Sequence, residues 1–141
     1  MTTLPETKAC KVNIENEWLT ISFNQPEKRN ALTSELTDDI KNIFDAARDD
    51  LGVRGVTMRG EGGIFCAGGD LKMFKTGFQG GEQGMKDVEE ASALTGAFFD
   101  MINSYPKPVV MLAEGAAMAG GLGMLCACLL YTSPSPRDNS G

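Results

Sequence analysis

Two glycine-rich turns, each placed directly after a short apolar segment, constrain the fold of this chain most. Residues 54–59, which include Val56 and Met58 and which we interpret as a buried strand, lead into the first turn, and the apolar residues 109–113 lead into the second. The glycines are Gly60, Gly62, Gly63, Gly68 and Gly69 in the first turn and Gly115, Gly120, Gly121 and Gly123 in the second. A strand, a glycine-rich turn and a helix, occurring twice, predict an α/β fold with both turns at the C-terminal edge of one sheet. A functional site is expected at that edge.

The segment before the first turn carries clear strand and helix patterns. Apolar and polar residues alternate over residues 10–15 and again over 18–24, which predicts a β-hairpin. Helical spacing then relates the apolar residues Leu32, Leu36, Ile40, Ile43, Phe44, Ala47 and Leu51. Thr33 stands at the position expected for an N-cap, and acidic residues follow near the positive end of the helix dipole. We therefore predict an amphipathic helix that ends at Gly52.

Three further helices are predicted after the first turn. Residues 70–74 fit a short helix, whereas the glycines and glutamines of residues 76–84 are typical of a surface loop. An apolar stripe then predicts a helix over residues 85–104, which ends before Pro106. The stripe consists of Met85, Val88, Leu94, Phe98, Met101 and Ile102. Small residues after the second turn predict a last helix through Cys128.

Composition excludes several functional classes. The 141 residues suffice for one modest core, and the formal net charge of -6 disfavours a general nucleic-acid or anionic-membrane surface. An anionic ligand must therefore be bound by a local basic patch. The chain contains no histidine, so Ser-His-Asp, Cys-His and histidine-based zinc sites are excluded for this chain acting alone. No metal site is expected.

The cysteines and the first residues bear on location. Cys10, Cys66, Cys126 and Cys128 form no CxxC pair, and we interpret them as small buried hydrophobic residues in a reducing compartment. Residues 1–11 have neither the apolar run of a secretory signal nor the composition of a transit peptide. A cytoplasmic location is the expectation.

The last residues differ in character from the rest. After Cys128 the sequence changes to one rich in serine and proline that no helix can continue. We expect residues 1–128 to be the N-terminal part of one domain. Residues 129–141 are expected to be a disordered tail that is not native to the protein.

Three segments together resemble the crotonase superfamily, which contains the enoyl-CoA hydratases and isomerases. They are NQPEKRNAL at residues 24–32, FCAGGDLK at residues 65–72, and residues 107–123, from KPVV through GAAMAGGLG. The resemblance covers about the first half of such a domain. It implies a crotonase-like α/β fold of ββα spiral units, truncated before the C-terminal part. It further implies a site that binds acyl-CoA, with coenzyme A as part of the substrate and no separate cofactor.

The resemblance assigns the central chemistry to two backbone groups. By motif position, the peptide N–H groups of Gly69 and Gly120 would stabilise the enolate oxyanion formed at the thioester carbonyl. Glycine suits both places because the absence of Cβ lets a ligand approach the backbone closely. Gly120 is also predicted to begin a helix, whose dipole favours negative charge. The alternative is that these glycines only form tight turns.

Further substrate contacts follow from the same resemblance. Ala67 resembles the residue whose carbonyl meets the adenine, and Lys28, Arg29 and Lys72 resemble basic residues that face the phosphates. The complete substrate-binding set is Lys28, Arg29, Ala31, Ala67, Gly68, Asp70, Leu71, Lys72 and Gly121. Each basic residue can instead be a solvated surface charge, and Asp70 can be a helix N-cap.

The sequence departs from the family at its acid/base residues. Hydratases commonly place a glutamate three residues beyond the second oxyanion glycine, where this chain has Gly123. The second carboxylate comes from a later segment, so neither member of the usual pair is present. Relatives without the first glutamate include branched-chain hydratases, isomerases and dehalogenases. Glu114 lies too far before Gly120 to be a convincing substitute base.

Other hypotheses remain open at this stage. The chain can be an inactive fragment or a non-catalytic relative that binds acyl-CoA without turnover, or belong to a dehalogenase or hydrolase branch. Residues 109–130 form a long apolar run that could be read as a membrane segment. Gly121 and Gly123 could also belong to a dinucleotide-binding motif. The third glycine of that motif is replaced by Cys126, and no acidic residue follows at the required distance. Family members form trimers or hexamers through later helices, so we do not expect this chain to assemble in that way.

Overall fold

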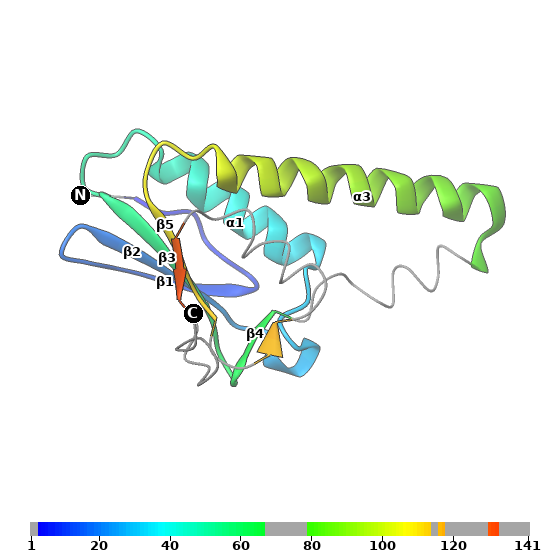
Figure 1. The fold of residues 1–141 in the computed structure, drawn as a ribbon, viewed down its shortest axis with the longest axis horizontal. Helices are drawn as coiled ribbons and strands as arrows, with labels where there is room; N and C mark the ends of the chain where they lie inside the picture. The colour runs from blue at the N-terminus through cyan, green and yellow to red at the C-terminus, as the bar shows by residue number, and fades with distance from the viewer. Residues whose placement is uncertain (1–2, 67–78, 114–115, 118–129, 133–141) are drawn as a thin grey trace, which may run out of the picture.

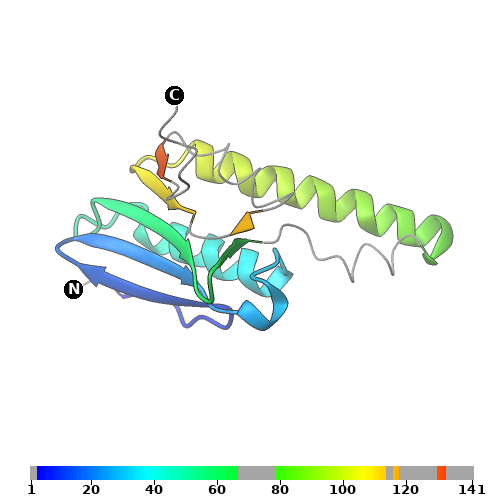
Figure 2. The same ribbon diagram turned by 60° about the horizontal axis from the view of Figure 1, so that its bottom comes forward.

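A computed structural model of the chain describes residues 3–66, 79–113, 116–117 and 130–132. The described residues form a five-stranded sheet with helices on one face and a second, two-stranded sheet (Figures 1 and 2). In chain order the elements are β1 (Cys10–Glu15), β2 (Trp18–Phe23), the 3₁₀ turn η1 (Pro26–Lys28), α1 (Ser34–Ala47), β3 (Gly55–Gly60), β4 (Ile64–Cys66), α3 (Gly81–Asn103), β5 (Val109–Leu112), β6 (Ala116–Ala117) and β7 (Leu130–Thr132).

The main sheet is parallel except at one edge. Its strand order is β1-β2-β3-β5-β7, in which β1 pairs antiparallel with β2 and the other neighbours pair in parallel. Parallel neighbours need a crossover, and α1 supplies the one between β2 and β3 while α3 lies between β3 and β5. Both helices cover the same face (Figure 2). The predicted α/β architecture is therefore confirmed.

The predicted hairpin is confirmed in its bounds and its pairing. Val12 lies opposite Ile21 in the register, and the two turn residues are Asn16 and Glu17. Their φ angles are 53° and 62°, so both occupy the left-handed region. Two consecutive residues of this kind form the turn whose twist matches that of the flanking strands, which explains why a two-residue connection suffices.

Helix α1 begins as predicted but ends early. The hydroxyl of Thr33 accepts a hydrogen bond from the Leu36 N–H at 3.2 Å, as expected of an N-cap. The helix ends at Ala47 rather than at Gly52. Leu51, expected on the buried stripe, is 94% exposed, because the chain has already left the helix and turned toward β3.

Helix α3 is longer than predicted and only partly buried. It begins at Gly81, so the last residues of the predicted loop 76–84 are helical. Toward its C-terminal end Phe98 and Ile102 pack into the core, whereas Leu94 and Met85 are exposed. Figure 1 shows the reason: the N-terminal part of α3 extends beyond the sheet. Met85 and Leu94 of the predicted stripe are therefore not part of the core.

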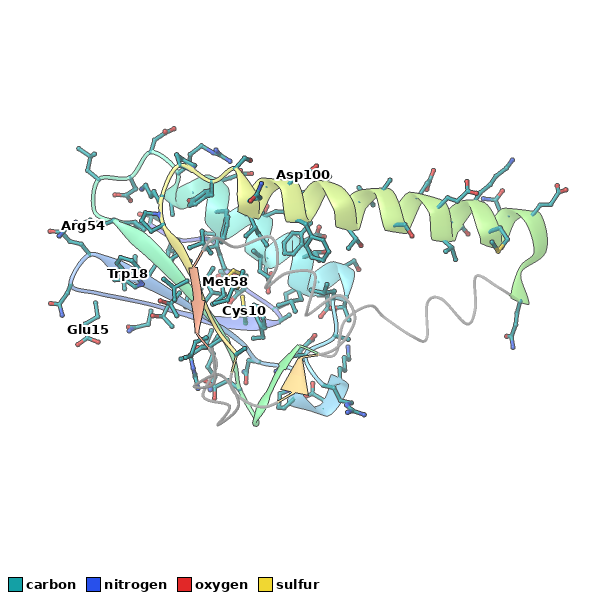
Figure 3. The ribbon with its side chains drawn as sticks, in the orientation of Figure 1. Cys10, Glu15, Trp18, Arg54, Met58 and Asp100 are labelled. Atoms are coloured by element: carbon teal, nitrogen blue, oxygen red, sulfur yellow. The ribbon has the colours of Figure 1, made fainter. Side chains whose placement is uncertain are left out.

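One core lies between the sheet and the helices. Met58 on β3 (Figure 3) and Phe44 on α1 are fully buried, and Met111 on β5 belongs to the same apolar cluster. The end of α1 is joined to the chain before β5: the Tyr105 hydroxyl donates to the Phe44 carbonyl at 2.6 Å, and Lys107 Nζ donates to the carbonyls of Ala47 and Asp50. A cation near the C-terminal carbonyls of a helix also interacts favourably with the dipole.

Two short strands, β6 and β7, differ from the sequence expectations. Residues 116–117, assigned to the second turn, form strand β6. Leu130–Thr132, assigned to a disordered tail, form strand β7 beside β5, so the expectation of disorder does not hold for these three residues. Residues 70–74, the predicted last helix and residues 133–141 lie outside the described residues.

The possible membrane segment begins with a strand. Residues 109–112 are β5, whose central position in the sheet explains its apolar composition. In the part of the chain that the structure describes, no helix has the length and apolar character needed to cross a bilayer.

Candidate active site at the paired glycine-rich turns

A second, two-stranded sheet brings the two glycine-rich segments together. Strand β4 pairs in parallel with β6, with Ile64 opposite Ala116 and Cys66 opposite Ala117. Gly69 lies three residues after Cys66, and Gly120 lies three residues after Ala117. The two chains therefore leave this small sheet in the same direction, at the same distance in sequence from the two candidate glycines.

The main sheet independently supports this arrangement. Strands β3 and β5, which precede the two glycine-rich segments, are parallel neighbours with Met58 opposite Met111. Both segments therefore start from the same edge of the main sheet, as the sequence predicted. In open α/β sheets this C-terminal edge is where ligands bind.

The loop carrying Lys28 and Arg29 lies beside the small sheet (Figures 1 and 2). It is a compact turn in which the Gln25 carbonyl accepts hydrogen bonds from the Lys28 and Asn30 N–H groups, both at 2.9 Å. Arg29 and Asn30 have φ angles of 57° and 51°. The left-handed conformation is unfavourable for arginine and easier for asparagine, so the surrounding contacts must hold this loop in shape.

Asn30 connects this loop to the turn between β3 and β4. It is fully buried, its Oδ1 accepts from the Gln25 N–H at 2.9 Å, and its Nδ2 donates to the Glu61 carbonyl at 3.0 Å. Glu61 is itself fixed, because its N–H donates to the Phe23 carbonyl and its side chain pairs with Arg59 at 2.9 Å. Sequence reasoning assigned Asn30 no role. The tolerance of asparagine for left-handed turns was the available signal.

Close contact between Pro26 and Gly62 completes this connection. Gly62 has a φ of 79°, and a Cβ built on it would lie 2.5 Å from the Pro26 Cβ. Only glycine meets both conditions without displacement of a neighbour. Gly63 has a similar φ of 75°, but a Cβ there would contact nothing within 4 Å.

The basic side chains of the loop are available to a ligand. Lys28 and Arg29 are both exposed, and in the described ranges neither takes part in an ion pair. Ala31, the third predicted contact in this segment, is half-buried where the chain approaches α1. The structure thus brings the basic loop to the same end of the molecule as the small sheet.

The remaining predicted site residues cannot be placed. Ala67, Gly68, Gly69, Asp70, Leu71, Lys72, Gly120 and Gly121 lie outside the described residues, as do Glu114 and Gly123. What the structure contributes to the candidate site is the pairing of the two strands that lead into it and the location of the basic loop.

A buried cysteine and aspartate form a structural junction elsewhere. Asp39 on α1 accepts hydrogen bonds from the N–H groups of Lys8 and Ala9 at 2.8 and 2.6 Å, and Cys10 Sγ lies 3.7 Å from the same carboxylate oxygen. Burial, with the nearby Asp39 charge, raises the pKa of the Cys10 thiol to about 12. A thiol of this kind is unreactive at neutral pH, as expected of a buried hydrophobic cysteine. Across the described residues no three side chains of the metal-binding types gather.

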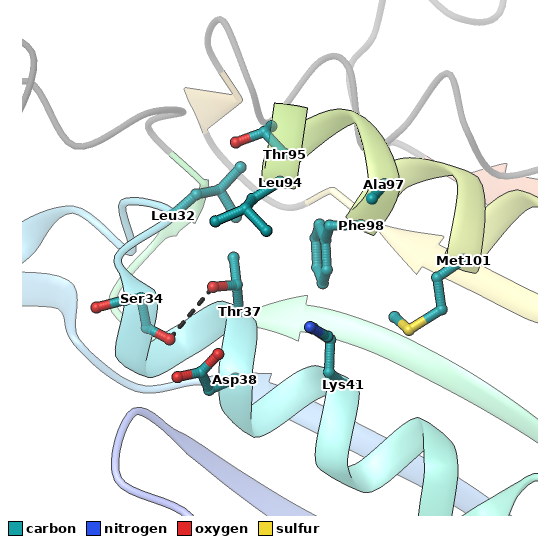
Figure 4. Close-up of a pocket in the computed structure, with 10 residues that line it drawn as sticks. All are labelled: Leu32, Ser34, Thr37, Asp38, Lys41, Leu94, Thr95, Ala97, Phe98 and Met101. Atoms are coloured by element: carbon teal, nitrogen blue, oxygen red, sulfur yellow. Dashed lines mark hydrogen bonds between the residues drawn. The ribbon is translucent and has the colours of Figure 1, made fainter. Parts of the chain in front are cut away.

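An apolar cavity of about 250 Å³ lies between α1 and α3 (Figure 4). Its lining residues are Leu32, Ser34, Thr37, Asp38, Lys41, Leu94, Thr95, Ala97, Phe98 and Met101. Phe98 forms its apolar wall, and Lys41 extends toward it from α1. Lys28, Arg29 and Ala31 are not among the described residues that line it.

The fold and the site together define a class of α/β protein. The two strands that precede the glycine segments in sequence are paired in parallel, with a basic loop alongside. The sequence matches the enoyl-CoA hydratase/isomerase family over residues 18–130, and the chain belongs to that family.

Individual relatives agree with this assignment. The chain is 36% identical over 99 residues to a Bacillus subtilis (strain 168) protein named "Probable enoyl-CoA hydratase", an alignment covering 70% of this chain and 36% of that protein. An enoyl-CoA hydratase/isomerase structure from Xanthobacter autotrophicus Py2 matches with a TM-score of 0.79 and 26% identity, covering 91% of this chain and 46% of that one. An enoyl-CoA hydratase structure from Polaromonas sp. JS666 matches with a TM-score of 0.78 and 31% identity, covering 89% and 48%.

The fold is thus the crotonase fold, represented over part of its length. The chain spans about half of the length of the solved relatives that it matches and a smaller share of the Bacillus subtilis protein.

Proposed function

We propose that this chain binds an acyl-CoA thioester and stabilises the oxyanion of its enolate with the N–H groups of Gly69 and Gly120. The parallel register of β4 and β6 is the observation that supports this most, because it starts both glycine segments from adjacent positions. Two donors aimed at one oxygen stabilise charge that develops there, and the loss of one such donor costs on the order of a hundred- to a thousandfold in rate.

The basic loop supplies the second half of the proposal. Lys28 and Arg29 would face the phosphates of coenzyme A, with Lys72 joining them and the Ala67 carbonyl meeting the adenine. A protein with a net charge of -6 needs a local basic patch to hold a polyanion. Both loop cations are exposed, and neither forms an ion pair with another residue of the described ranges, which fits that role. Coenzyme A arrives as part of the substrate, so no further cofactor is proposed.

The acid/base residues bear on the reaction that is proposed. With Gly123 at the usual glutamate position, the proposed chemistry is hydration or isomerisation of an enoyl-CoA in fatty-acid or branched-chain/isoprenoid acid breakdown, using a carboxylate from elsewhere in the domain. Taken alone, the chain would bind acyl-CoA without turnover. We also propose a cytoplasmic location.

A conjugated dienoyl-CoA tests the oxyanion site without requiring turnover. Its absorbance moves to longer wavelength when the thioester carbonyl accepts hydrogen bonds, because the excited state carries more negative charge on that oxygen. We expect a shift on binding to the unaltered chain. Gly69→Pro and Gly120→Pro each remove one N–H donor and should reduce the shift strongly.

Controls distinguish loss of a donor from loss of the fold. Gly96→Ala, at a helical position where a Cβ meets nothing within 4 Å, should leave the shift unchanged. Far-ultraviolet circular dichroism should report the same helix content for all variants. Binding of the dienoyl-CoA without any shift in the unaltered chain, or a full shift in both proline variants, would refute the proposal.

A further inference from the structure

We infer that Asn30 and the Pro26–Gly62 contact form a clamp that positions the basic loop for recognition of the coenzyme A phosphates. The inference rests on the proposed function, and it assigns specificity to residues that touch no substrate. Asn30, Pro26 and Gly62 are therefore positioning residues, which act through Lys28 and Arg29.

The first half of the clamp is polar and joins segments distant in sequence. Asn30 Oδ1 accepts a hydrogen bond from the Gln25 N–H, and Asn30 Nδ2 donates one to the Glu61 carbonyl. The Asn30 side chain is fully buried. Removal of either contact would leave a buried backbone group without its partner, which costs more than an exposed hydrogen bond. The loop geometry at Arg29 and Asn30 therefore depends on the β3–β4 turn.

The second half of the clamp is steric. The Pro26 ring lies against Gly62 so closely that no other residue fits without displacing one of the two segments. Pro26 also begins η1, and its carbonyl accepts the Arg29 N–H at 2.9 Å. A displacement at Gly62 would consequently be transmitted to the backbone that carries Arg29.

The two contacts together couple two parts of the site. The β3–β4 turn leads directly into β4, whose register with β6 sets where the glycine segment begins. The clamp joins the basic loop to that same turn. The phosphate end of a ligand and its thioester end are thereby held at a fixed separation, which is the form of pre-organisation that raises affinity.

Two adjacent glycines provide a matched test. Gly62→Ala and Gly63→Ala impose the same backbone cost, because both positions have a positive φ of similar size, but only the first creates a clash with Pro26. The readout is the ratio of the affinities for hexadienoyl-CoA and hexadienoyl-pantetheine, measured by titration of the unaltered full chain and its variants. The second probe lacks the nucleotide phosphates, so a general loss of folding lowers both affinities while a displaced basic loop lowers only the first.

The clamp predicts a specific pattern across the variants. Gly62→Ala should lower the affinity ratio about tenfold, the size expected for loss of one charge-assisted contact. Gly63→Ala should leave the ratio unchanged, and Pro26→Gly combined with Gly62→Ala should recover part of the loss by removing the clashing Cβ. In Asn30→Gly the residue still tolerates the φ of 51°, but the hydrogen bonds to Gln25 and Glu61 are lost. This variant should also lower the affinity ratio, and it tests the clamp if Gly62→Ala fails to fold.

The outcomes separate this inference from the proposed function. Lys28→Gln combined with Arg29→Gln should lower the affinity for hexadienoyl-CoA toward that for hexadienoyl-pantetheine. An unchanged affinity ratio in that variant would contradict phosphate recognition by the loop. If that variant loses the preference while Gly62→Ala behaves like Gly63→Ala and Asn30→Gly keeps the full ratio, the proposed function stands and the clamp is wrong.

Discussion

The core between α1 and the main sheet differs from the region around the small sheet in how each is held together. The first depends on buried apolar side chains such as Phe44 and Met58, which interdigitate across the two layers. The second depends on backbone pairing of β4 with β6, on Asn30 and on a glycine contact. We therefore expect substitutions in the core to affect stability and substitutions around the small sheet to affect ligand recognition. The core variants below should change stability, whereas the clamp variants should change ligand preference.

The largest loss of stability is expected from Phe44→Ala. Phe44 is fully buried and its ring centroid lies 4.4 Å from that of Tyr105, so truncation leaves a cavity in the centre of the core. We expect a loss of about 3–5 kcal/mol in the free energy of unfolding. Urea denaturation followed by circular dichroism measures it. A loss below about 1 kcal/mol would mean that this region is not the source of stability.

Gly55→Ala should follow, with a loss of about 1–3 kcal/mol. A Cβ on Gly55 would lie 2.4 Å from the Trp18 ring, which must then move and give up the hydrogen bond from its Nε1 to Thr57 Oγ1 at 2.8 Å. Trp18 is the single tryptophan, so its fluorescence emission should shift as well. Gly96→Ala is the matched control and should be neutral or slightly stabilising, because a Cβ there is unopposed within a helix.

Tyr105→Phe should cost about 1–2 kcal/mol, because it leaves the Phe44 carbonyl without its 2.6 Å donor while keeping the ring. Thermal unfolding followed by calorimetry measures the change. An unaltered midpoint would show that solvent replaces the lost hydroxyl and that the end of α1 is less enclosed than the structure indicates.

Alkaline pH should weaken the same core. In the folded chain burial raises the Cys10 pKa to about 12, whereas the unfolded thiol has its ordinary value of 9.0. Above pH 9 the unfolded state releases this proton and the folded state keeps it, so this contribution to stability is complete below pH 9 and declines as the pH rises toward 12. The slope for one proton is at most about 1.4 kcal/mol per pH unit. Denaturation of Cys10→Ala between pH 8 and 10 should show a shallower decline; an identical slope would contradict this assignment.

The smallest effect is expected from Leu94→Ala. This residue is 66% exposed and lines the cavity between α1 and α3, although its place on the apolar stripe suggested a core position. Its truncation should change the free energy of unfolding by less than about 0.5 kcal/mol. Phe98→Ala, one turn further along and 3% exposed, is the paired variant and should cost several times more.

Local sequence signals predicted the first region well. The alternation of apolar and polar residues predicted the hairpin, and Thr33 as N-cap, together with the helical spacing of apolar residues, predicted the start of α1. Both signals arise within a few neighbouring residues. The errors fell where packing decides. Leu51 and Leu94 fit their apolar patterns but are exposed, and the glycines near residue 81 concealed the start of α3.

The second region was predicted only in outline. The two glycine segments were expected at one sheet edge, which the parallel pairing of β3 with β5 confirms. The pairing of β4 with β6 was missed, because two alanines among glycines carry no strand signal of their own. Asn30 and Glu61 are 31 residues apart, so their contact is a property of the folded chain that no local pattern reports.

The central claim is that two main-chain amides share one thioester oxygen, and nuclear magnetic resonance of chain labelled with ¹⁵N-glycine tests it most directly. Crotonyl-CoA should move the amide proton resonances of both Gly69 and Gly120 to lower field, whereas the thioether analogue without the carbonyl oxygen should leave them nearly unchanged. Movement of only one resonance, or equal movement with both ligands, would contradict the account.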